Sequence, residues 1–155
     1  MTIKRLPSSI RGDNFRVGVV LSRFNADISE GLLAGALRGL NEAGVDDGRV
    51  LIVSVPGALE TPLALQRLAQ TNDYDALVAL GAVIRGDTYH FEIVANESAA
   101  GVSNVALDFG IPVGNGILTC DTEDQAHARM NQKGYEAALA AIEMANLLIA
   151  IDDED

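Results

Sequence analysis

The most reactive stretch of the chain is residues 81–94, GAVIRGDTYHFEIV, in which an apolar run gives way to polar groups. Arg85 supplies a guanidinium, Asp87 a carboxylate, Thr88 a hydroxyl and His90 an imidazole. Because an imidazole can give or take a proton near neutral pH, His90 could act in proton transfer. It could also only cap or pack the start of a helix. We favour proton transfer, because several other polar groups share this short segment.

The turn Gly86-Asp87-Thr88, directly before a predicted helix, resembles an anion-binding nest. Free backbone N–H groups and a helix N-terminus favour negative charge there. The same residues are also ordinary turn and cap chemistry. Arg85 could neutralise a phosphate or pair with Asp87. No Gly-Lys-Ser/Thr follows, and no G-x-G-x-x-G occurs after a strand, which excludes a P-loop and a dinucleotide fingerprint.

Further binding groups follow the other strands. Phe24 could stack on a heterocycle, and Asn25 and Glu60 could orient it by hydrogen bonds, although packing or capping would also account for all three. Arg129 is a second candidate for binding an anion, with a plain surface arginine as the alternative. His127 is expected to face solvent.

Other kinds of site find little support. No His, Cys, Asp and Glu cluster has metal-ligand spacing, so no metal is expected. No G-x-S-x-G nucleophile elbow is present. Cys120, the single cysteine, is conceivable as a nucleophile, but nothing near it in the sequence would activate the thiol.

Four apolar segments predict the buried strands that position these groups, at residues 16–22, 49–55, 75–84 and 111–119. The first helix is expected to be capped by Asp27 or Ser29 and to be stopped by Gly44. The second ends near Gln70, and the third spans residues 91–109, up to Gly110. After the last strand we expect a short helix at residues 120–127, a break at Gly134, and a long helix at 135–149.

This alternation indicates a three-layer α/β/α sandwich around a four-stranded parallel sheet, a flavodoxin-like fold. The carboxyl ends of all parallel strands meet at one edge, which gathers four chain segments in one crevice. They are residues 24–25, 56–60, 81–90 and 115–121.

The length of 155 residues suits one domain, at residues 16–150. Residues 1–15 are expected to form an arm, with a strand around residues 2–6 that adds to a neighbouring subunit. Residues 151–155 are expected to form a solvated acidic tail. The hydrophobic content of 48% either fills a core rich in Ala and Val or is buried against other subunits.

The net charge of −11 argues against nucleic-acid and anionic-membrane partners, both of which need basic surface. No apolar run approaches the roughly 20 residues that span a bilayer, and no signal peptide is visible at the N-terminus. One cysteine cannot form an intrachain disulfide, which is typical of a reducing compartment. We therefore expect a cytoplasmic protein.

Several segments together resemble the lumazine synthase family. They appear in the family's order from Arg16 onward, and GAVIRGDTYHFE is the most specific of them. The others are RFN at 23–25, VPGALE at 55–60, IPV at 111–113, GILT at 116–119, EDQA at 123–126, and KG at 133–134 leading to AIEMA at 141–145.

The resemblance implies a transferase of riboflavin biosynthesis that needs neither a metal nor an organic cofactor. It condenses 5-amino-6-(D-ribitylamino)uracil with 3,4-dihydroxy-2-butanone 4-phosphate. The products are 6,7-dimethyl-8-ribityllumazine, phosphate and water.

The resemblance also assigns roles to individual residues. Phe24 stacks on the pyrimidine, Glu60 with the backbone at 58–59 holds the ribityl chain, and His90 transfers protons. The implied aminouracil site comprises Phe24, Ala58, Leu59, Glu60, Ala82, Val83, Ile84 and Asn115. The implied butanone phosphate site comprises Gly86, Asp87, Thr88 and Arg129.

In this family the site lies between subunits of a homopentamer, and the neighbour supplies the Asn115 region and Arg129. Many members carry an aromatic residue where this chain has Asn115. The linker between Arg129 and Lys133-Gly134 is shorter than in capsid-forming members, so we expect a pentamer; decamers and sixty-subunit shells also occur. Riboflavin synthase is a candidate partner. The alternatives are a non-catalytic flavin- or lumazine-binding member, and an unrelated flavodoxin-like binding domain.

Overall fold

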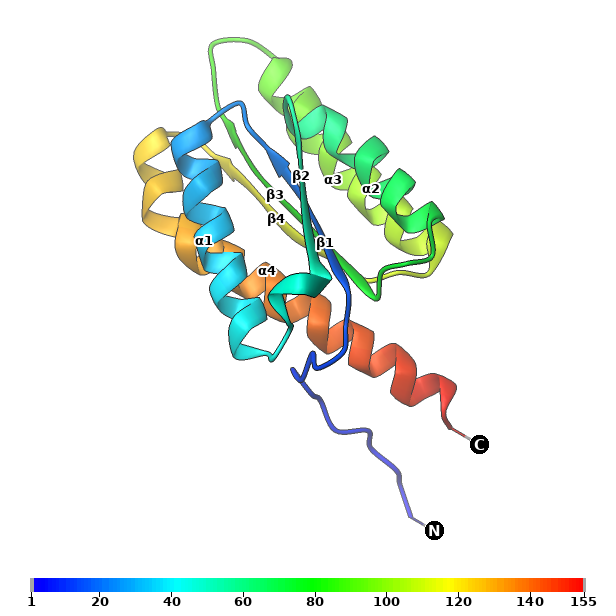
Figure 1. The fold of residues 1–155 in the computed structure, drawn as a ribbon. Helices are drawn as coiled ribbons and strands as arrows, with labels where there is room; N and C mark the ends of the chain where they lie inside the picture. Colours follow the sequence, from blue (N-terminus) through cyan, green and yellow to red (C-terminus); the bar gives the residue numbers. More distant parts are fainter. Residues whose placement is uncertain (1, 155) are drawn as a thin grey trace.

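The computed structural model describes residues 2–154 and has alternating strands and helices (Figure 1). The strands are β1 (Val17–Ser22), β2 (Val50–Val55), β3 (Ala76–Ile84) and β4 (Val113–Cys120). The α-helices are α1 (Ala26–Glu42), α2 (Thr61–Gln70), α3 (His90–Phe109) and α4 (Glu123–Asp152). Two short 3₁₀ helices, η1 (Asp47–Arg49) and η2 (Ala58–Glu60), flank β2.

The four strands form one parallel sheet in the order β2-β1-β3-β4. Val17 of β1 pairs with Val50 of β2 and with Ala76 of β3, and Leu77 of β3 pairs with Val113 of β4. The central strand β1 is buried throughout, and β3 is buried except at its last residue, whereas the edge strand β2 is largely exposed. The predicted four-stranded parallel sheet is confirmed, and burial on both faces explains the apolar runs of β1 and β3. The prediction of a buried strand at residues 49–55 is wrong, because β2 lies at the edge of the sheet.

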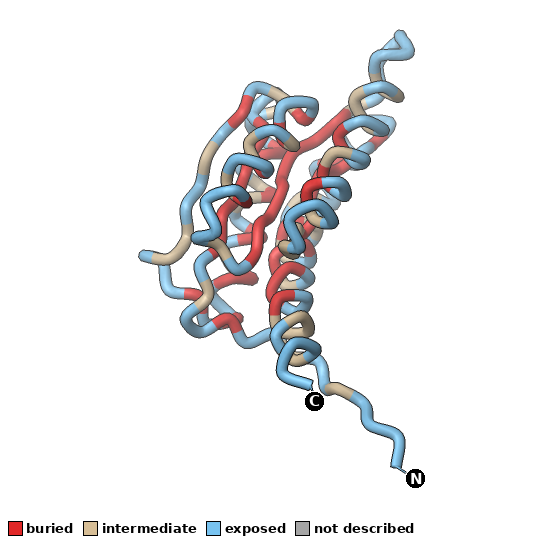
Figure 2. Tube along the Cα trace, turned by 90° about the vertical axis from the view of Figure 1, so that its right-hand side faces the viewer, coloured by how far each residue is buried: buried red, intermediate tan, exposed pale blue. Residues whose placement is uncertain are grey.

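Helices α1 and α4 cover one face of the sheet, and α2 and α3 cover the other (Figure 1). Successive residues of a strand point to opposite faces, so Val19 packs toward α1 and α4 and Val20 toward α2 and α3. Figure 2 shows the buried residues concentrated along the strands and the inward sides of the helices. This is the expected three-layer α/β/α architecture.

The predicted break at Gly134 is wrong, because α4 is a single helix of 30 residues. A Cβ atom at Gly134 would lie 2.0 Å from the backbone oxygen of Leu32, and one at Gly35 would lie 2.0 Å from that of Asn131. The glycines therefore allow α1 and α4 to pack backbone against backbone. The predicted short helix at 120–127 is therefore wrong as well. So is the linker expected after Arg129, since residues 129–134 are helical.

Helix ends differ from the predictions in detail. Helix α1 begins at Ala26 with Asn25 at its N-cap, so neither Asp27 nor Ser29 caps it. The Ser29 hydroxyl instead donates a hydrogen bond to the carbonyl oxygen of Ser22. Gly44 (φ +88°) and Gly110 (φ +61°) follow α1 and α3 in left-handed conformations, as expected for helix-stopping glycines.

The N-terminal arm extends away from the domain beside the end of α4 (Figure 1). Among the described residues 2–12, none is assigned to a strand or helix, so the strand expected around residues 2–6 does not form within this chain. Asn146 donates hydrogen bonds to the carbonyl oxygens of Ser9 and Arg11, and Lys4 pairs with Glu154 at 2.7 Å. Helix α4 extends to Asp152, so the expected acidic tail begins inside it.

Contrary to the sequence prediction, α4 is long and apolar enough to cross a membrane by length and composition alone. Only 33% of its most apolar window is buried, and Met144, Ile149 and Ile151 are exposed. Ala138 and Ile142 are fully buried against α1 and the sheet. The helix therefore packs one side against the core and leaves apolar residues exposed on another.

Candidate active site

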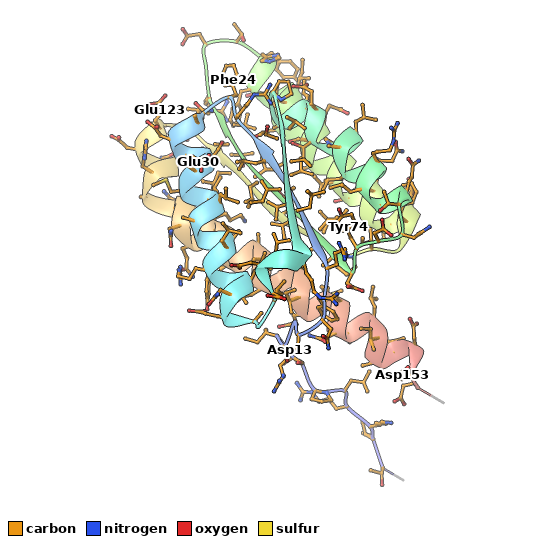
Figure 3. All side chains as sticks on the ribbon, in the orientation of Figure 1. Asp13, Phe24, Glu30, Tyr74, Glu123 and Asp153 are labelled. Carbon is orange, nitrogen blue, oxygen red and sulfur yellow. The ribbon has the colours of Figure 1, made fainter. Side chains whose placement is uncertain are left out.

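A cleft of about 630 Å³ opens at the carboxyl edge of the sheet, where the sequence predicted a crevice. The loops after β1, β2 and β3 form it, and Figure 3 shows Phe24 and Glu123 at this edge of the molecule. Most of the predicted site residues line the cleft: Phe24, Ala58, Leu59, Glu60, Ala82, Val83, Ile84, Gly86, Thr88 and His90.

The cleft has an apolar wall and an exposed aromatic side chain. Ala82 and Val83, at the end of β3, are buried, and Ile84 is half-buried. Phe24 is 83% exposed, so packing within this chain does not account for it and its ring is open to stack on a planar ligand. Asn25 holds the loop after β1 by donating to the carbonyl oxygen of Ala82 at 3.3 Å.

The loop after β2 presents polar groups to the same cleft. Residues 58–60 form η2, and Glu60 is the N-cap residue of α2. The Glu60 side chain makes no capping hydrogen bond, so its carboxylate is open to accept hydrogen bonds from a ligand. This region suits a polyhydroxylated chain, whose hydroxyl groups pair well with a carboxylate.

The loop between β3 and α3 brings His90 to the cleft as the first residue of α3. His90 is exposed, and its backbone N–H lies 3.4 Å from the Thr88 hydroxyl oxygen, which accepts the hydrogen bond. A Cβ atom at Gly86 would meet no atom within 4 Å, so a ligand can approach that backbone closely. Asp87 is exposed and does not line the cleft.

The expected pair of Arg85 with Asp87 is wrong, because Arg85 pairs with Asp121 and Glu92. The hydrogen bonds that Arg85 donates to Asp121 and then to Glu92 raise its pKa above the ordinary value. The Arg85 hydrogen bond correspondingly lowers the pKa of the Glu92 carboxyl. Sequence reasoning missed both partners. The register offered a signal for Asp121: Ile84 pairs with Cys120, which places the next residues of β3 and β4 side by side.

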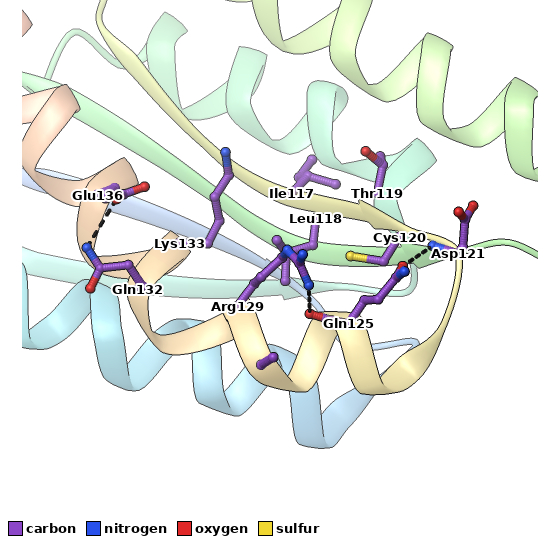
Figure 4. Close-up of a pocket in the computed structure, with 11 residues that line it drawn as sticks. Ile117, Leu118, Thr119, Cys120, Asp121, Gln125, Arg129, Gln132, Lys133 and Glu136 are labelled. Atoms are coloured by element: carbon purple, nitrogen blue, oxygen red, sulfur yellow. Dashed lines mark hydrogen bonds between the residues drawn. The ribbon is translucent and has the colours of Figure 1, made fainter.

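Arg129 and Asn115 lie outside this cleft. Arg129 lines a second cavity, of about 650 Å³, between β4 and α4 (Figure 4). Its Nη1 donates to the Gln125 carbonyl oxygen at 2.9 Å, and Lys133 lies one turn further along the helix. Asn115 is exposed on the edge strand β4, and its Oδ1 accepts from the Ile117 N–H at 3.0 Å. One chain therefore does not bring Arg129 to Gly86 and Thr88.

His127 and Cys120 also lie outside this cleft. His127 is exposed on α4, as predicted. Cys120 is a free, buried thiol that lines the second cavity. Within residues 2–154, no group of three or more His, Cys, Asp and Glu side chains is arranged to hold a metal ion.

Fold and cleft together define a parallel α/β domain whose ligand site lies at the carboxyl ends of its strands. The family model described as 6,7-dimethyl-8-ribityllumazine synthase matches residues 14–149. Curated proteins with that name match nearly the whole chain. The protein from Nitrosospira multiformis is 59% identical over 151 residues, 97% of this chain and 94% of its own length. That from Nitrosomonas europaea is 54% identical over 153 residues, 99% and 93% of the two chains. The chain belongs to the 6,7-dimethyl-8-ribityllumazine synthase family.

Proposed function

We propose that this protein is the transferase that condenses 5-amino-6-(D-ribitylamino)uracil with 3,4-dihydroxy-2-butanone 4-phosphate, in riboflavin biosynthesis. The observation that carries the proposal is the single cleft that joins His90 to an apolar wall and a free aromatic ring. Membership of the family supports it. We place the reaction in the cytoplasm, which is consistent with the free thiol of Cys120.

The chemistry requires proton transfers at every step. The amine of the uracil attacks the ketone, and water leaves as an imine forms. Phosphate is then eliminated, the ribitylamino nitrogen attacks the remaining carbonyl carbon, and a second water leaves as the ring closes. His90, at the end of the loop after β3, is the group in the cleft suited to give and take these protons. Holding the two substrates side by side supplies a further large part of the acceleration.

Each substrate has a proposed position. The pyrimidine stacks on Phe24 and lies against Ala82, Val83 and Ile84, and the ribityl chain extends along residues 58–60 to Glu60. The phosphate of the butanone lies at the turn of residues 86–88, before the N-terminus of α3. The dipole and N–H groups of the helix favour an anion there.

This phosphate needs a further cation. Of the described residues that line the cleft, Arg85 carries the fixed positive charge, and two carboxylates already neutralise it. We propose that Arg129 and the Asn115 region of a second copy complete the site in a homopentamer. The position of Arg129 in a separate cavity, open at the edge of the sheet, supports this arrangement. Native mass measurement would distinguish a pentamer from a decamer or a sixty-subunit shell.

The direct test mixes the purified protein with both substrates and follows phosphate release together with lumazine absorbance. The proposal predicts stoichiometric phosphate and lumazine, formed well above the uncatalysed rate. Binding of lumazine without turnover would instead support a non-catalytic member, which the position of His90 in the cleft disfavours.

A further inference from the structure

Arg85 is the centre of an ion-paired cluster that has no part in the chemistry described above. Its Nε lies 2.8 Å from Oδ1 of Asp121, and its Nη1 lies 2.6 Å from Oε1 of Glu92. Its guanidinium carbon lies 4.4 Å from the centre of the Phe91 ring, a cation–π distance. Its backbone N–H donates to the Cys120 carbonyl oxygen at 2.9 Å. One residue thus joins the ends of β3 and β4 to the first turn of α3.

These contacts close the loop that carries the reactive groups. Residues 86–89 are exposed and belong to no strand or helix. Arg85 precedes this loop, and its partners Phe91 and Glu92 follow it directly. Within the described chain, the side-chain hydrogen bond made by residues 86–90 themselves is the long one from the His90 N–H to the Thr88 hydroxyl. Phe91 and Val94 pack the start of α3 against the core, and the Arg85 side chain adds the polar contacts that tie this turn to β3 and β4.

The charges argue against a direct role of Arg85 in phosphate binding. One guanidinium faces two carboxylates, so the cluster of Arg85, Glu92 and Asp121 has a formal net charge of one unit negative. The two carboxylates engage Nε and Nη1, and their negative charge opposes an arriving phosphate. The arrangement instead suits a fixed support for the loop.

We propose that Arg85 is a positioning residue, which holds His90 and the turn of residues 86–88 in the geometry that the condensation needs. The inference rests on the proposed function. Exposed ion pairs contribute little to global stability, and Arg85 is 48% exposed. Its removal should therefore loosen the loop and slow the reaction while the domain stays folded. Because a displacement of about 1 Å can cost about 100-fold in rate, we expect a fall in kcat of about 10-fold.

Two variants and a matched control test this proposal. Arg85→Ala removes the centre of the cluster, and Glu92→Gln removes one partner that lines neither cavity. Arg67→Ala, at an exposed position on α2, is the control. Without substrate, we expect backbone amides of residues 86–93 to exchange several-fold faster in both variants and at the wild-type rate in the control. Equal exchange in all four proteins would overturn the proposal, whether or not the chain is a synthase.

Steady-state kinetics give a second, independent readout. Positioning predicts that Glu92→Gln lowers kcat and leaves the KM of the aminouracil unchanged. If Arg85 bound phosphate directly, freeing it from Glu92 would lower the KM of the phosphorylated substrate without lowering kcat, which would overturn the inference.

A double variant shows whether Arg85 acts through His90. Arg85→Ala should cost about 10-fold in the wild type but less than about 2-fold in the His90→Ala background, because coupled residues are not additive. Additive losses would overturn a role through His90. If the wild-type protein shows no turnover, the proposed function itself is refuted. That result differs from both the additive and the non-additive outcome of the double variant.

Discussion

Gly134 provides a quantitative test of how α4 is positioned. Replacement by Ala ordinarily favours a helix interior by about 1 kcal/mol. Here the new Cβ would lie 2.0 Å from the backbone oxygen of Leu32, whereas van der Waals contact needs about 3.5 Å. A backbone atom cannot rotate away, so α1 and α4 must separate. Overpacking of this kind costs about 1–3 kcal/mol, and we expect Gly134→Ala to lower the free energy of unfolding by about 2 kcal/mol.

Urea unfolding followed by circular dichroism measures this loss, at one fixed protein concentration because assembly shifts apparent stability. Gly31→Ala is the matched control in the same helix pair. Its Cβ would meet the flexible side chain of Met130, which can move, so its effect should stay within about 1 kcal/mol. The reasoning is refuted if Gly134→Ala is as stable as the wild type, or if both variants lose equally.

Three further predictions concern the site. His90→Ala should lower kcat on the order of 100-fold with modest loss of substrate binding, and unchanged turnover would remove its proton-transfer role. Arg129→Ala should raise the KM of the phosphorylated substrate about 10-fold and leave that of the aminouracil unchanged, as steady-state kinetics with each substrate varied would show. Arg85 lowers the pKa of Glu92, so their pairing stabilises the fold above the ordinary pKa of a glutamate and is lost as the pH falls through the lowered value. Unfolding at a series of pH values should accordingly show a stability difference between the wild type and Glu92→Gln at neutral pH that disappears in acid; a constant difference would contradict the ion pair.

The sheet could be predicted from the sequence because its four strands are apolar runs, two of which, β1 and β3, are buried on both faces. A strand such as β3 then reads as a continuous apolar run, and its end at Ile84 is visible where polar residues begin. The crevice followed from topology alone, since the ends of parallel strands share one edge. The loops after β1, β2 and β3 do meet in one cleft, which contains Phe24, Glu60 and His90. The fourth predicted segment, residues 115–121, does not join them, because residues 117–121 line the separate cavity.

The errors have a common physical cause, which is that local signals do not report distant packing. A glycine within a helical pattern suggests a break, yet Gly134 serves the close approach of α4 to Leu32, about a hundred residues earlier in the chain. In the same way, the partners of Arg85 come from β4 and α3 rather than from the adjacent Asp87. The role of Arg129 in phosphate binding stays a prediction, because within one chain this residue lines a separate cavity.

The central claim is that this chain is a synthase whose site needs residues of two copies, and subunit complementation tests it most directly. His90→Ala and Arg129→Ala chains are unfolded together, refolded as a 1:1 mixture, and assayed for lumazine formation at a low concentration of the phosphorylated substrate. If His90 and Arg129 of one site come from different copies, about a quarter of the sites in mixed rings contain both native residues. The account therefore predicts about a quarter of the wild-type rate, about two- to three-fold above Arg129→Ala alone and far above His90→Ala alone. A mixture no more active than the mean of the two separate variants would contradict it.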